Sequence, residues 1–398
     1  MKQMIPGLPK KANRFMKLVH YFPTTRFTEG GTVRAAIDFC TVLARRGHEV
    51  TWLTCDDADV PQSWKDGEPN TPIIKLLGPL QKAGKRLTKQ QIAIAAEVAK
   101  NADVTHIHAM WMPSNPQMAK ACDSVGTPWV LSTHGMLDDW CMEQRGLKKK
   151  FYLATAGRIL IRGATTFLTT AEAEKSQSEK WLKHSNIAVI PYIVDLEPYK
   201  EIPSPQEAID KYGLAEEPTI LFLSRVHEKK SIETLIDATA ILKQRGYSTR
   251  VFIAGTGEDA YVKSLQKRAE VAGVSDNVTF LGMVVGTLKL SLYAMADVFA
   301  LPTQQENFGL VYPEAMLCET PAIGTKGTDI WKELEEGGAV IAERTAEAFA
   351  DAILTLTSDK ALLKTKGEEG RKYILEWLDT NSVAERYEEM YLAAASGH

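Results

Sequence analysis

Residues 301–325, LPTQQENFGLVYPEAMLCETPAIGT, combine two carboxylates, a glycine turn and a short apolar helix. Asn-Phe-Gly at 307–309 predicts a tight turn, because asparagine and glycine tolerate a positive φ. A helix is predicted for residues 310–318, with apolar side chains along it. Pro313 fits only the first turn of that helix. The stretch therefore predicts a loop that leads directly into a buried helix.

The two carboxylates of this stretch are Glu306 on the loop and Glu314 in the helix, eight positions apart. The backbone N–H groups of Phe308, Gly309 and Leu310 point out of the helix N-terminus, where an anion is favoured. We therefore expect a site for a polyhydroxylated anion, with N–H groups for phosphate and carboxylates for hydroxyls. The alternative is a chance pair of solvated surface glutamates.

The composition indicates a globular protein with no general affinity for nucleic acid. The chain has 398 residues, enough for two domains, with 44% hydrophobic and 24% charged residues and a net charge of −3. Its five cysteines have no metal-finger spacing, which is typical of reduced thiols. Without an 18-residue apolar run or a signal-peptide core, we expect a cytoplasmic protein.

Strands and helices alternate through the chain in two successive series. This alternation predicts parallel sheets with right-handed crossovers, and hence two Rossmann-like α/β domains. The proline-rich segment 191–206 reads as the linker between them. We predict an N-terminal domain at 17–195 and a C-terminal domain at 196–375. Residues 1–16 read as a disordered basic tail, and Met16 as a second candidate start.

In the first domain, three residues follow predicted strands at their carboxyl ends, where ligands of such sheets bind. Gly30 and Gly31 close the loop after the first strand and would let a substrate approach the backbone. The alternative is a loop that simply needs glycine. His134 follows the strand 129–132 and could bond a sugar hydroxyl or stabilise developing charge. The alternative is a loop histidine bonded to the backbone.

His106 and His108 lie two positions apart on one predicted strand, so their side chains share a face. A metal site is one interpretation, but no third ligand is evident nearby in the sequence. We treat both histidines as structural or pocket-lining residues.

In the second domain, Arg225 and Lys230 bracket the loop after the strand 219–223. Two fixed cations there suit a diphosphate, and a leaving group whose charge grows in the transition state. The alternative is a pair of surface cations. Lys229 is adjacent, so the register could differ by one residue.

Two glycine turns follow later strands of the second domain. Gly255 begins Gly-x-Gly-x-x-Ala, formally a dinucleotide fingerprint, but no acid follows to hold a ribose. Met283 comes directly after Gly282 at the end of the strand 278–281. Both turns lie where a parallel sheet presents its ligand-binding edge.

Residues 145–162 contain five lysines and arginines beyond Arg145 and no acid, interleaved with large apolar side chains. We predict a basic amphipathic helix, which can rest on an anionic membrane surface. The alternative is a half-buried helix with a solvated basic face.

The stretch 301–325 resembles the Glu-x7-Glu motif of retaining GT-B glycosyltransferases, family 4 in particular. The similar residues read Glu-Asn-Phe-Gly-Leu-Val, then Glu-Ala-Met, then Pro-Ala-Ile-Gly. The resemblance extends from Lys17 onward, specific in the second half and diffuse in the first. It implies two domains facing across a cleft, and a helix at 376–398 that packs back on the N-terminal domain. Tyr192-Ile193 departs from the family's usual Asn-Gly.

The resemblance implies transfer of a sugar from a nucleotide-sugar donor to an acceptor hydroxyl, with retained configuration and no metal or other cofactor. Glu306 would bind sugar hydroxyls, and Glu314 would bind the ribose. A glycan or lipid-linked acceptor is implied, in cell-surface polysaccharide or lipid-linked glycan synthesis, with peripheral membrane contact through 145–162. The residues implied for catalysis are Glu306, His134, Arg225 and Lys230. Those implied for donor binding are Gly30, Gly31, Arg225, Lys230, Gly255, Met283, Asn307, Phe308, Gly309, Leu310 and Glu314.

Other functions fit the same sequence. A nucleotide-sugar epimerase of the same fold, or a non-catalytic nucleotide-sugar binding protein, would need the same donor site. A phosphorylase would need a lysine for pyridoxal phosphate, for which no motif is seen. A dehydrogenase would rest on the Gly255 turn alone and would bind NAD.

Overall fold

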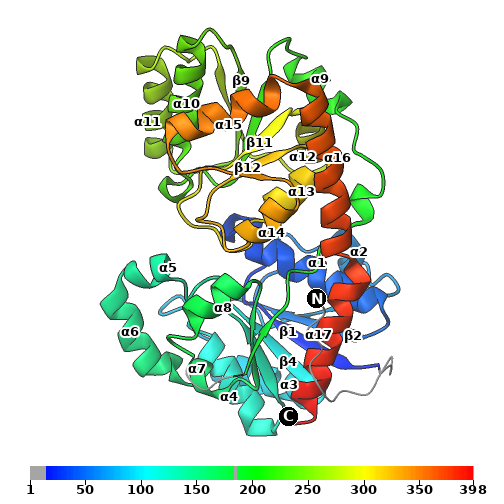
Figure 1. The fold of residues 1–398 in the computed structure, drawn as a ribbon. Coiled ribbons are helices and arrows are strands. Elements are labelled where there is room, and N and C mark those ends of the chain that lie inside the picture. Colours follow the sequence, from blue (N-terminus) through cyan, green and yellow to red (C-terminus); the bar gives the residue numbers. More distant parts are fainter. Residues whose placement is uncertain (1–14, 183–185, 398) are drawn as a thin grey trace.

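The computed structural model describes residues 15–182 and 186–397, and it confirms the predicted pair of parallel α/β domains (Figure 1). The first sheet has seven strands in the order β3-β2-β1-β4-β5-β6-β7, and the second has six in the order β10-β9-β8-β11-β12-β13. In each, neighbouring strands run parallel, as the crossover helices require.

The first domain begins with a strand that is buried at four of its five positions, β1. Its strands are β1 (Lys17–Tyr21), β2 (Glu49–Thr54), β3 (Ile73–Leu76), β4 (Val104–His108), β5 (Trp129–Ser132), β6 (Thr166–Thr169) and β7 (Ile187–Val189). Its helices are α1 (Gly31–Arg45), α2 (Gln62–Lys65), α3 (Lys89–Lys100), α4 (Asn115–Val125), α5 (Asp139–Glu143), α6 (Gly146–Ala154), α7 (Leu160–Gly163) and α8 (Glu172–Ser178).

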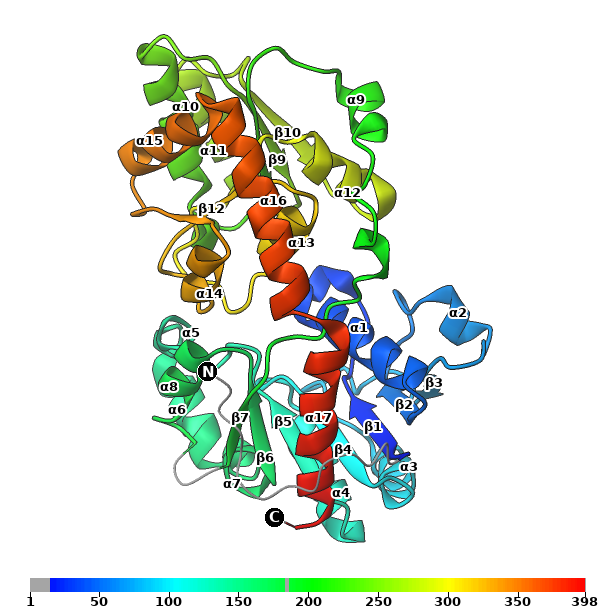
Figure 2. The same ribbon diagram turned by 45° about the vertical axis from the view of Figure 1, so that its right-hand side comes forward.

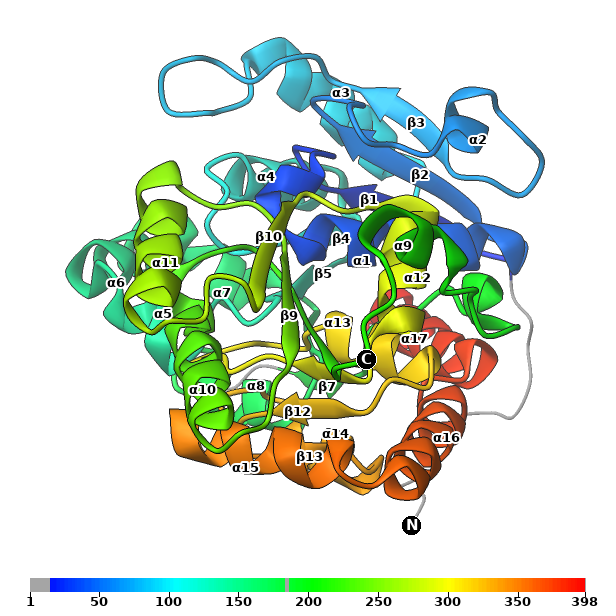
Figure 3. The same cartoon turned by 90° about the horizontal axis from the view of Figure 1, so that it is seen from above.

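The second domain is built around β8, whose apolar residues are buried as expected for a strand covered on both faces. Its strands are β8 (Thr219–Leu223), β9 (Arg250–Ala254), β10 (Val278–Gly282), β11 (Val298–Ala300), β12 (Ala322–Gly324) and β13 (Val340–Ile341). Its helices are α9 (Gln206–Tyr212), α10 (Ile232–Gln244), α11 (Asp259–Val271), α12 (Gly286–Met295), α13 (Val311–Leu317), α14 (Trp331–Glu336), α15 (Ala346–Thr357) and α16 (Lys360–Trp377). In Figure 3, α10 and α11 lie on one side of this sheet and α9 and α12 on the other.

Helix α17 (Thr380–Ala395) leaves the second domain and packs along the first (Figure 2). Its apolar face, which includes Val383, Tyr387 and Met390, joins the same buried cluster as residues of α1 and β1. On its other side Glu388 bonds Arg46, with Oε1 2.6 Å from Nε and Oε2 3.1 Å from Nη2. Residues far apart in sequence thus complete one core.

The first part of the segment 191–206, predicted as a linker, is buried, whereas residues 200–206 are mostly exposed. Tyr192, Ile193 and Val194 are buried, and Tyr199 in a 3-10 turn (Glu197–Tyr199) is buried as well. Thr380 donates its hydroxyl to the carbonyl of Val194 at 3.1 Å. The two chain crossings between the domains therefore lie against one another.

The single amphipathic helix predicted for 145–162 is wrong. The chain forms α6, then a 3-10 turn (Ala156–Arg158), then α7. The ring of Tyr152 packs against the backbone of Gly157, so closely that a Cβ there would overlap it. This contact folds the chain back after Ala154, and the basic residues do not share one continuous helix face.

Most of the predicted basic tail, residues 1–14, lies outside the described residues. Met16 is buried in the core of the first domain, 2% exposed. No helix in the ranges 15–182 and 186–397 has both the length and the apolar character needed to cross a bilayer.

Candidate active site between the two domains

The loop between β11 and α13 has the predicted turn before a short helix. Gly309 has φ +63°, and a Cβ there would lie 2.9 Å from Glu306 Cγ and 2.9 Å from Tyr312 Cδ2. A side chain at this position would meet both a strained backbone and a steric clash. Tyr312 anchors the helix by donating to the carbonyl of Leu301 at 3.0 Å. The sequence therefore builds one compact turn around Glu306.

Glu306 is paired with a cation of the same domain. Its carboxylate accepts a hydrogen bond from Lys230 Nζ in an ion pair, and the lysine side chain is 7% exposed. Burial raises the pKa of Glu306, but the charge and hydrogen bond of Lys230 outweigh it, so the pKa lies below its ordinary value. Glu306 is therefore an anion beside a buried cation.

Glu314 is held by different partners, both on α12. Its Oε1 accepts from Lys289 Nζ at 2.6 Å, and its Oε2 accepts from the Tyr293 hydroxyl at 3.1 Å. Neither partner was predicted from the sequence, because each lies more than 20 positions away. Each of the two carboxylates of the motif thus forms its own ion pair with a different lysine.

Arg225 and Lys230 end up in different surroundings. Lys230 is buried at the end of a 3-10 turn (Glu228–Lys230), whereas Arg225 is exposed. The Arg225 guanidinium lies across the domain boundary from Gly30, since a Cβ on Gly30 would stand 4.0 Å from Arg225 Cζ. Gly30 has φ +120°, a conformation that favours glycine. The structure therefore brings Gly30 and Arg225 together from the two domains.

Packing alone explains why the turn at 255–258 has glycine at positions 255 and 257. A Cβ on Gly255 would overlap the carbonyl of Ser224, and one on Gly257 would overlap the carbonyl of Val226. The turn thus presses against the loop that carries Arg225. A donor-binding role for Gly255 stays a prediction.

Met283 follows β10 with 53% of its surface exposed, and Gly282 before it has φ +70°. Gly31 begins α1 and is exposed. Neither residue makes a described contact with Lys230 or Glu306. Their predicted donor contacts stay predictions.

His134 and Gly135 bring the first domain against the Glu306 loop. Both have positive φ, +52° and +69°, and a Cβ on Gly135 would lie 2.6 Å from Asn307 Cβ. Thr170 Oγ1 lies 2.6 Å from the Asn307 side-chain amide. The absence of a side chain at Gly135 therefore lets the two domains touch beside the turn at 307–309. This turn is predicted to bind the donor and is called the donor turn below.

His134 uses both ring nitrogens within the protein. Nδ1 lies 2.7 Å from the Tyr192 hydroxyl, and Nε2 lies 3.1 Å from His108 Nδ1. Burial lowers the pKa of His134 to about 3, so the ring is neutral. A bond from His134 to a sugar would have to replace one of these two partners.

Glu174 on α8 is a site residue that sequence reasoning missed. It is fully buried and accepts from Gly135 N at 2.6 Å, Thr133 Oγ1 at 2.6 Å and Thr170 N and Oγ1 at 2.7 and 2.8 Å. Burial raises its pKa, and these four bonds oppose the rise. The one available signal was an acid in the first turn of a helix, where it can cap backbone N–H groups.

Two family models match the chain in series. Residues 29–198 match the model described as Glycosyltransferase Family 4, and residues 205–373 match Glycosyl transferases group 1. The chain belongs to glycosyltransferase family 4. The first match covers the seven-stranded domain after β1, and the second covers most of the domain with Glu306.

Characterised relatives of this family 4 protein are distant. It is 29% identical over 259 residues to the GDP-mannose-dependent alpha-(1-6)-phosphatidylinositol monomannoside mannosyltransferase of Mycobacterium tuberculosis, over 62% of this chain and 64% of that relative. It is 26% identical over 360 residues to the D-inositol 3-phosphate glycosyltransferase of Xylanimonas cellulosilytica, over 83% of this chain and 84% of that relative. The match to the mannosyltransferase thus spans under two thirds of its length.

Solved structures confirm the predicted GT-B fold. The crystal structure of Anabaena HepE in complex with UDP and glucose is similar with a TM-score of 0.76 and 20% identity, over 95% of this chain and 100% of that one. Sucrose-phosphate synthase from Thermosynechococcus elongatus is similar with a TM-score of 0.75 and 19% identity, over 96% of this chain and 100% of that one. At these identities the likeness shows the fold.

Proposed function

We propose that this family 4 protein transfers a sugar from a nucleotide-sugar to an acceptor hydroxyl with retention of configuration. The observation that carries the proposal is the Glu306 turn, where a carboxylate, the buried cation Lys230 and the N-terminal turn of α13 meet. The arrangement suits a donor with a diphosphate at one end and sugar hydroxyls at the other.

The proposed chemistry follows from where charge develops. The bond from the anomeric carbon to the diphosphate oxygen breaks first, with oxocarbenium character, and the diphosphate gains negative charge. Arg225, Lys230 and the N–H groups near Gly309 stabilise that charge. The acceptor oxygen then bonds the same face of the anomeric carbon, and its proton passes to the leaving phosphate. Glu306 places the sugar, and Glu314 holds the ribose.

Both carboxylates must change partners for this to happen. Lys230 leaves Glu306 to meet the phosphate, and Glu314 shares its oxygens between Lys289 and the ribose hydroxyls. Lys230 thus exchanges one anionic partner for another, and Glu306 accepts hydrogen bonds from sugar hydroxyls instead, so neither buried charge is left without a polar partner, which would be costly.

For the acceptor, we propose a glycan or lipid-linked molecule. The relatives named above act, by name, on a phosphatidylinositol monomannoside and on inositol 3-phosphate. On this chain Leu147 and Phe151 of α6 are 87% and 71% exposed, beside the exposed cations Lys148 and Lys150. Exposed apolar side chains among cations favour an anionic bilayer surface.

The donor site is tested by thermal unfolding with UDP, GDP, ADP, TDP, NAD and their sugar conjugates. A ligand that binds the folded state raises the unfolding midpoint. We expect one nucleoside diphosphate to do so, and Arg225→Ala to reduce the shift. A shift with NAD alone would favour a dehydrogenase.

Turnover is tested with the sugar conjugates of the base so identified. We expect Glu306→Gln, which keeps the shape but removes the charge, to lower kcat by about 100-fold with little change in the unfolding midpoint. Glu319→Gln is the control on the same segment. Donor binding without turnover on any acceptor would favour a non-catalytic binding protein, and altered sugar stereochemistry an epimerase.

The membrane contact is tested by sedimentation with vesicles that contain anionic lipid. Replacing Leu147 and Phe151 with serine should reduce binding about 10-fold or more, since each loses its buried apolar area. The control replaces the equally exposed Leu214 and Val271 of the second domain. Equal losses from both pairs, or no binding by the parent, would contradict the contact.

A further inference from the structure

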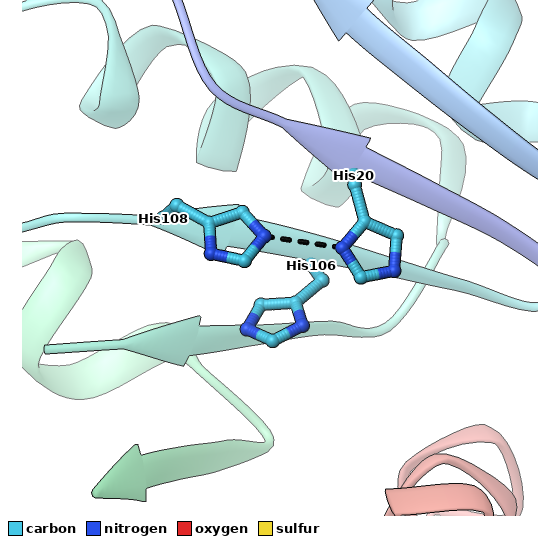
Figure 4. Close-up of side chains that lie close together, drawn as sticks. All are labelled: His20, His106 and His108. Carbon is cyan, nitrogen blue, oxygen red and sulfur yellow. Dashed lines mark hydrogen bonds between the residues drawn. The ribbon is translucent and has the colours of Figure 1, made fainter. Parts of the chain in front are cut away.

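Four buried side chains form a continuous hydrogen-bonded series through the first domain. His20 Nδ1 lies 3.1 Å from His108 Nε2, and His108 Nδ1 lies 3.1 Å from His134 Nε2. His134 Nδ1 lies 2.7 Å from the Tyr192 hydroxyl. Figure 4 shows the first of these bonds, between strands β1 and β4. The series starts in the sheet and ends at the crossing into the second domain.

A metal site is the competing account, because ring nitrogens of His20, His106 and His108 lie within 4.8 Å of one another. The rings of His106 and His108 stack, with centroids 4.2 Å apart and 19° between planes, so their in-plane lone pairs do not converge. His106 already bonds the Tyr391 hydroxyl at 2.6 Å and Ser132 Oγ at 2.7 Å. Of the ring nitrogens of these three histidines, only His20 Nε2 lacks a partner among the described residues, whereas a metal needs at least three converging ligands.

The series is neutral throughout. Burial lowers the pKa of His20 and His134 to about 3 and that of His108 well below its ordinary value, and it raises the pKa of Tyr192. A neutral imidazole donates from one nitrogen and accepts at the other. Each bond therefore fixes the direction of the next, and the three rings must share one tautomer.

Tyr192 at the end of the series touches the donor turn. Its ring centroid lies 5.0 Å from that of Phe308, which is 1% exposed between Glu306 and Gly309. On its other side Phe308 stacks on Trp377, 5.6 Å away with 19° between planes. Phe308 is thus held by one aromatic residue from each crossing between the domains.

We propose that His20, His108 and His134 act as one relay that fixes the Tyr192 hydroxyl, and that Tyr192 is a positioning residue for the donor turn. The relay holds Tyr192 against Phe308, and Phe308 sets the backbone between Glu306 and Gly309. The effect on donor binding rests on the proposed function, whereas the relay itself does not.

The relay is tested first without any activity, by nitrogen NMR of the full chain with labelled histidine. Imidazole nitrogen shifts distinguish the two neutral tautomers and the cation. We expect His20, His108 and His134 to be neutral and to share one tautomer near neutral pH. Tyr192→Phe should perturb all three rings, and Tyr21→Phe, which removes a buried hydroxyl without a described partner, should perturb none. Differing tautomers, a charged ring, or metal-like shifts on adding Zn²⁺ would overturn the relay.

The second test measures the donor KM. Tyr192→Phe loses one hydrogen bond and keeps the ring, so we expect a rise of about fivefold with the acceptor KM unchanged. His20→Phe should give a similar rise, and His20→Asn should restore the parent value, because an asparagine side chain can meet His108 where Nδ1 did.

The double variant of Tyr192→Phe and His20→Phe separates a relay from two independent defects. Members of one network are non-additive, so the double variant should be no worse than either single variant. Multiplied effects, equal rises in both KM values, or no rise would overturn the positioning role. If the parent shows no transfer at all, the proposed function fails while the NMR result still decides the relay.

Discussion

Glu306 and Glu314 belong to one short motif, yet each is held by a cation from a different segment. Lys230 reaches Glu306 from the loop after β8, and Lys289 reaches Glu314 from α12. A carboxylate that already has a charged partner is held in a fixed orientation before any ligand arrives. A ligand at this site would therefore replace existing partners of Glu306 and Glu314 rather than meet unpaired carboxylates.

Gly135 is the residue of the first domain that lies directly against Asn307 of the second. Replacing it with alanine places a methyl group against Asn307 and strains a residue with φ +69°. We expect Gly135→Ala to weaken donor binding about 10-fold by holding the domains apart, at a cost of about 1 kcal/mol in stability. Gly126→Ala, with φ +73° and open space around it, is the matched control for backbone strain alone. Binding that is weakened equally by both would remove Gly135 from the domain contact.

The residues of the motif could be predicted because they are neighbours in sequence. The Asn-Phe-Gly turn, the place of Pro313 and the loop position of Glu306 follow from local backbone chemistry. Glu174, Tyr192 and Lys289 could not be predicted in the same way. Their roles depend on contacts across 25 to 58 positions, which no local pattern encodes.

At the scale of elements, α17 is attached to the first domain by charge as well as by apolar packing. Burial raises the pKa of Glu388, but its bonds to His48 and Arg46 outweigh this, and the pKa falls to about 2. A carboxylate with a lowered pKa stabilises the fold above its ordinary value of 4.5, and the contribution is lost as pH falls toward 2.

Glu388→Gln should therefore lower the free energy of unfolding by about 1 to 2 kcal/mol at neutral pH, after allowance for solvent screening. The difference from the parent should shrink as pH falls below about 4.5. Urea unfolding at neutral and acidic pH measures both values. Glu389→Gln, the exposed neighbour, is the control. A constant difference at all pH values would show that the loss is one of packing.

The segment 145–162 shows why the spacing of apolar and charged residues alone cannot predict where a helix ends. Its composition is that of an amphipathic helix, but Gly157 and the Tyr152 ring create a turn in the middle. Leu147 and Phe151 are nevertheless exposed side by side with cations on α6. The correction concerns the shape of the segment, and the membrane contact remains a proposal about α6.

At the scale of the molecule, the boundary between the domains contains a buried acid. Asp329 Oδ1 accepts from Gln177 of the first domain at 2.9 Å and from Gln305 at 3.2 Å, while Oδ2 has no partner among the described residues. Burial, with repulsion from Glu174, raises the pKa of Asp329 to about 8. An acid with a raised pKa favours the fold at low pH, and the cost of ionising it grows as pH rises from about 4 to about 8.

Asp329→Asn keeps the shape and removes the ionisation. We expect it to raise the unfolding midpoint by about 2 to 4 °C at pH 8 and by little at pH 5. Differential scanning calorimetry measures both. Asp276→Asn, on the surface, controls for net charge. A gain that does not depend on pH would mean that Asp329 is not protonated in the folded protein.

The two-domain fold was predictable at this scale because each strand and helix carries its own periodicity. The arrangement of the domains was implied by the family resemblance alone, since it depends on single contacts such as Lys229 Nζ over the Trp140 ring, 4.5 Å from its centroid. Tertiary contacts of this kind leave no regular pattern in a sequence.

The position of α17 has a consequence for biosynthesis. Tyr387, Met390 and Tyr391 belong to the core of the first domain, yet the ribosome makes them after every strand of both sheets. The first domain therefore waits, with an apolar surface uncovered, while the second is translated and folds. A nascent chain stalled before Thr380 should be bound by chaperones, and a separately supplied α17 peptide should release it.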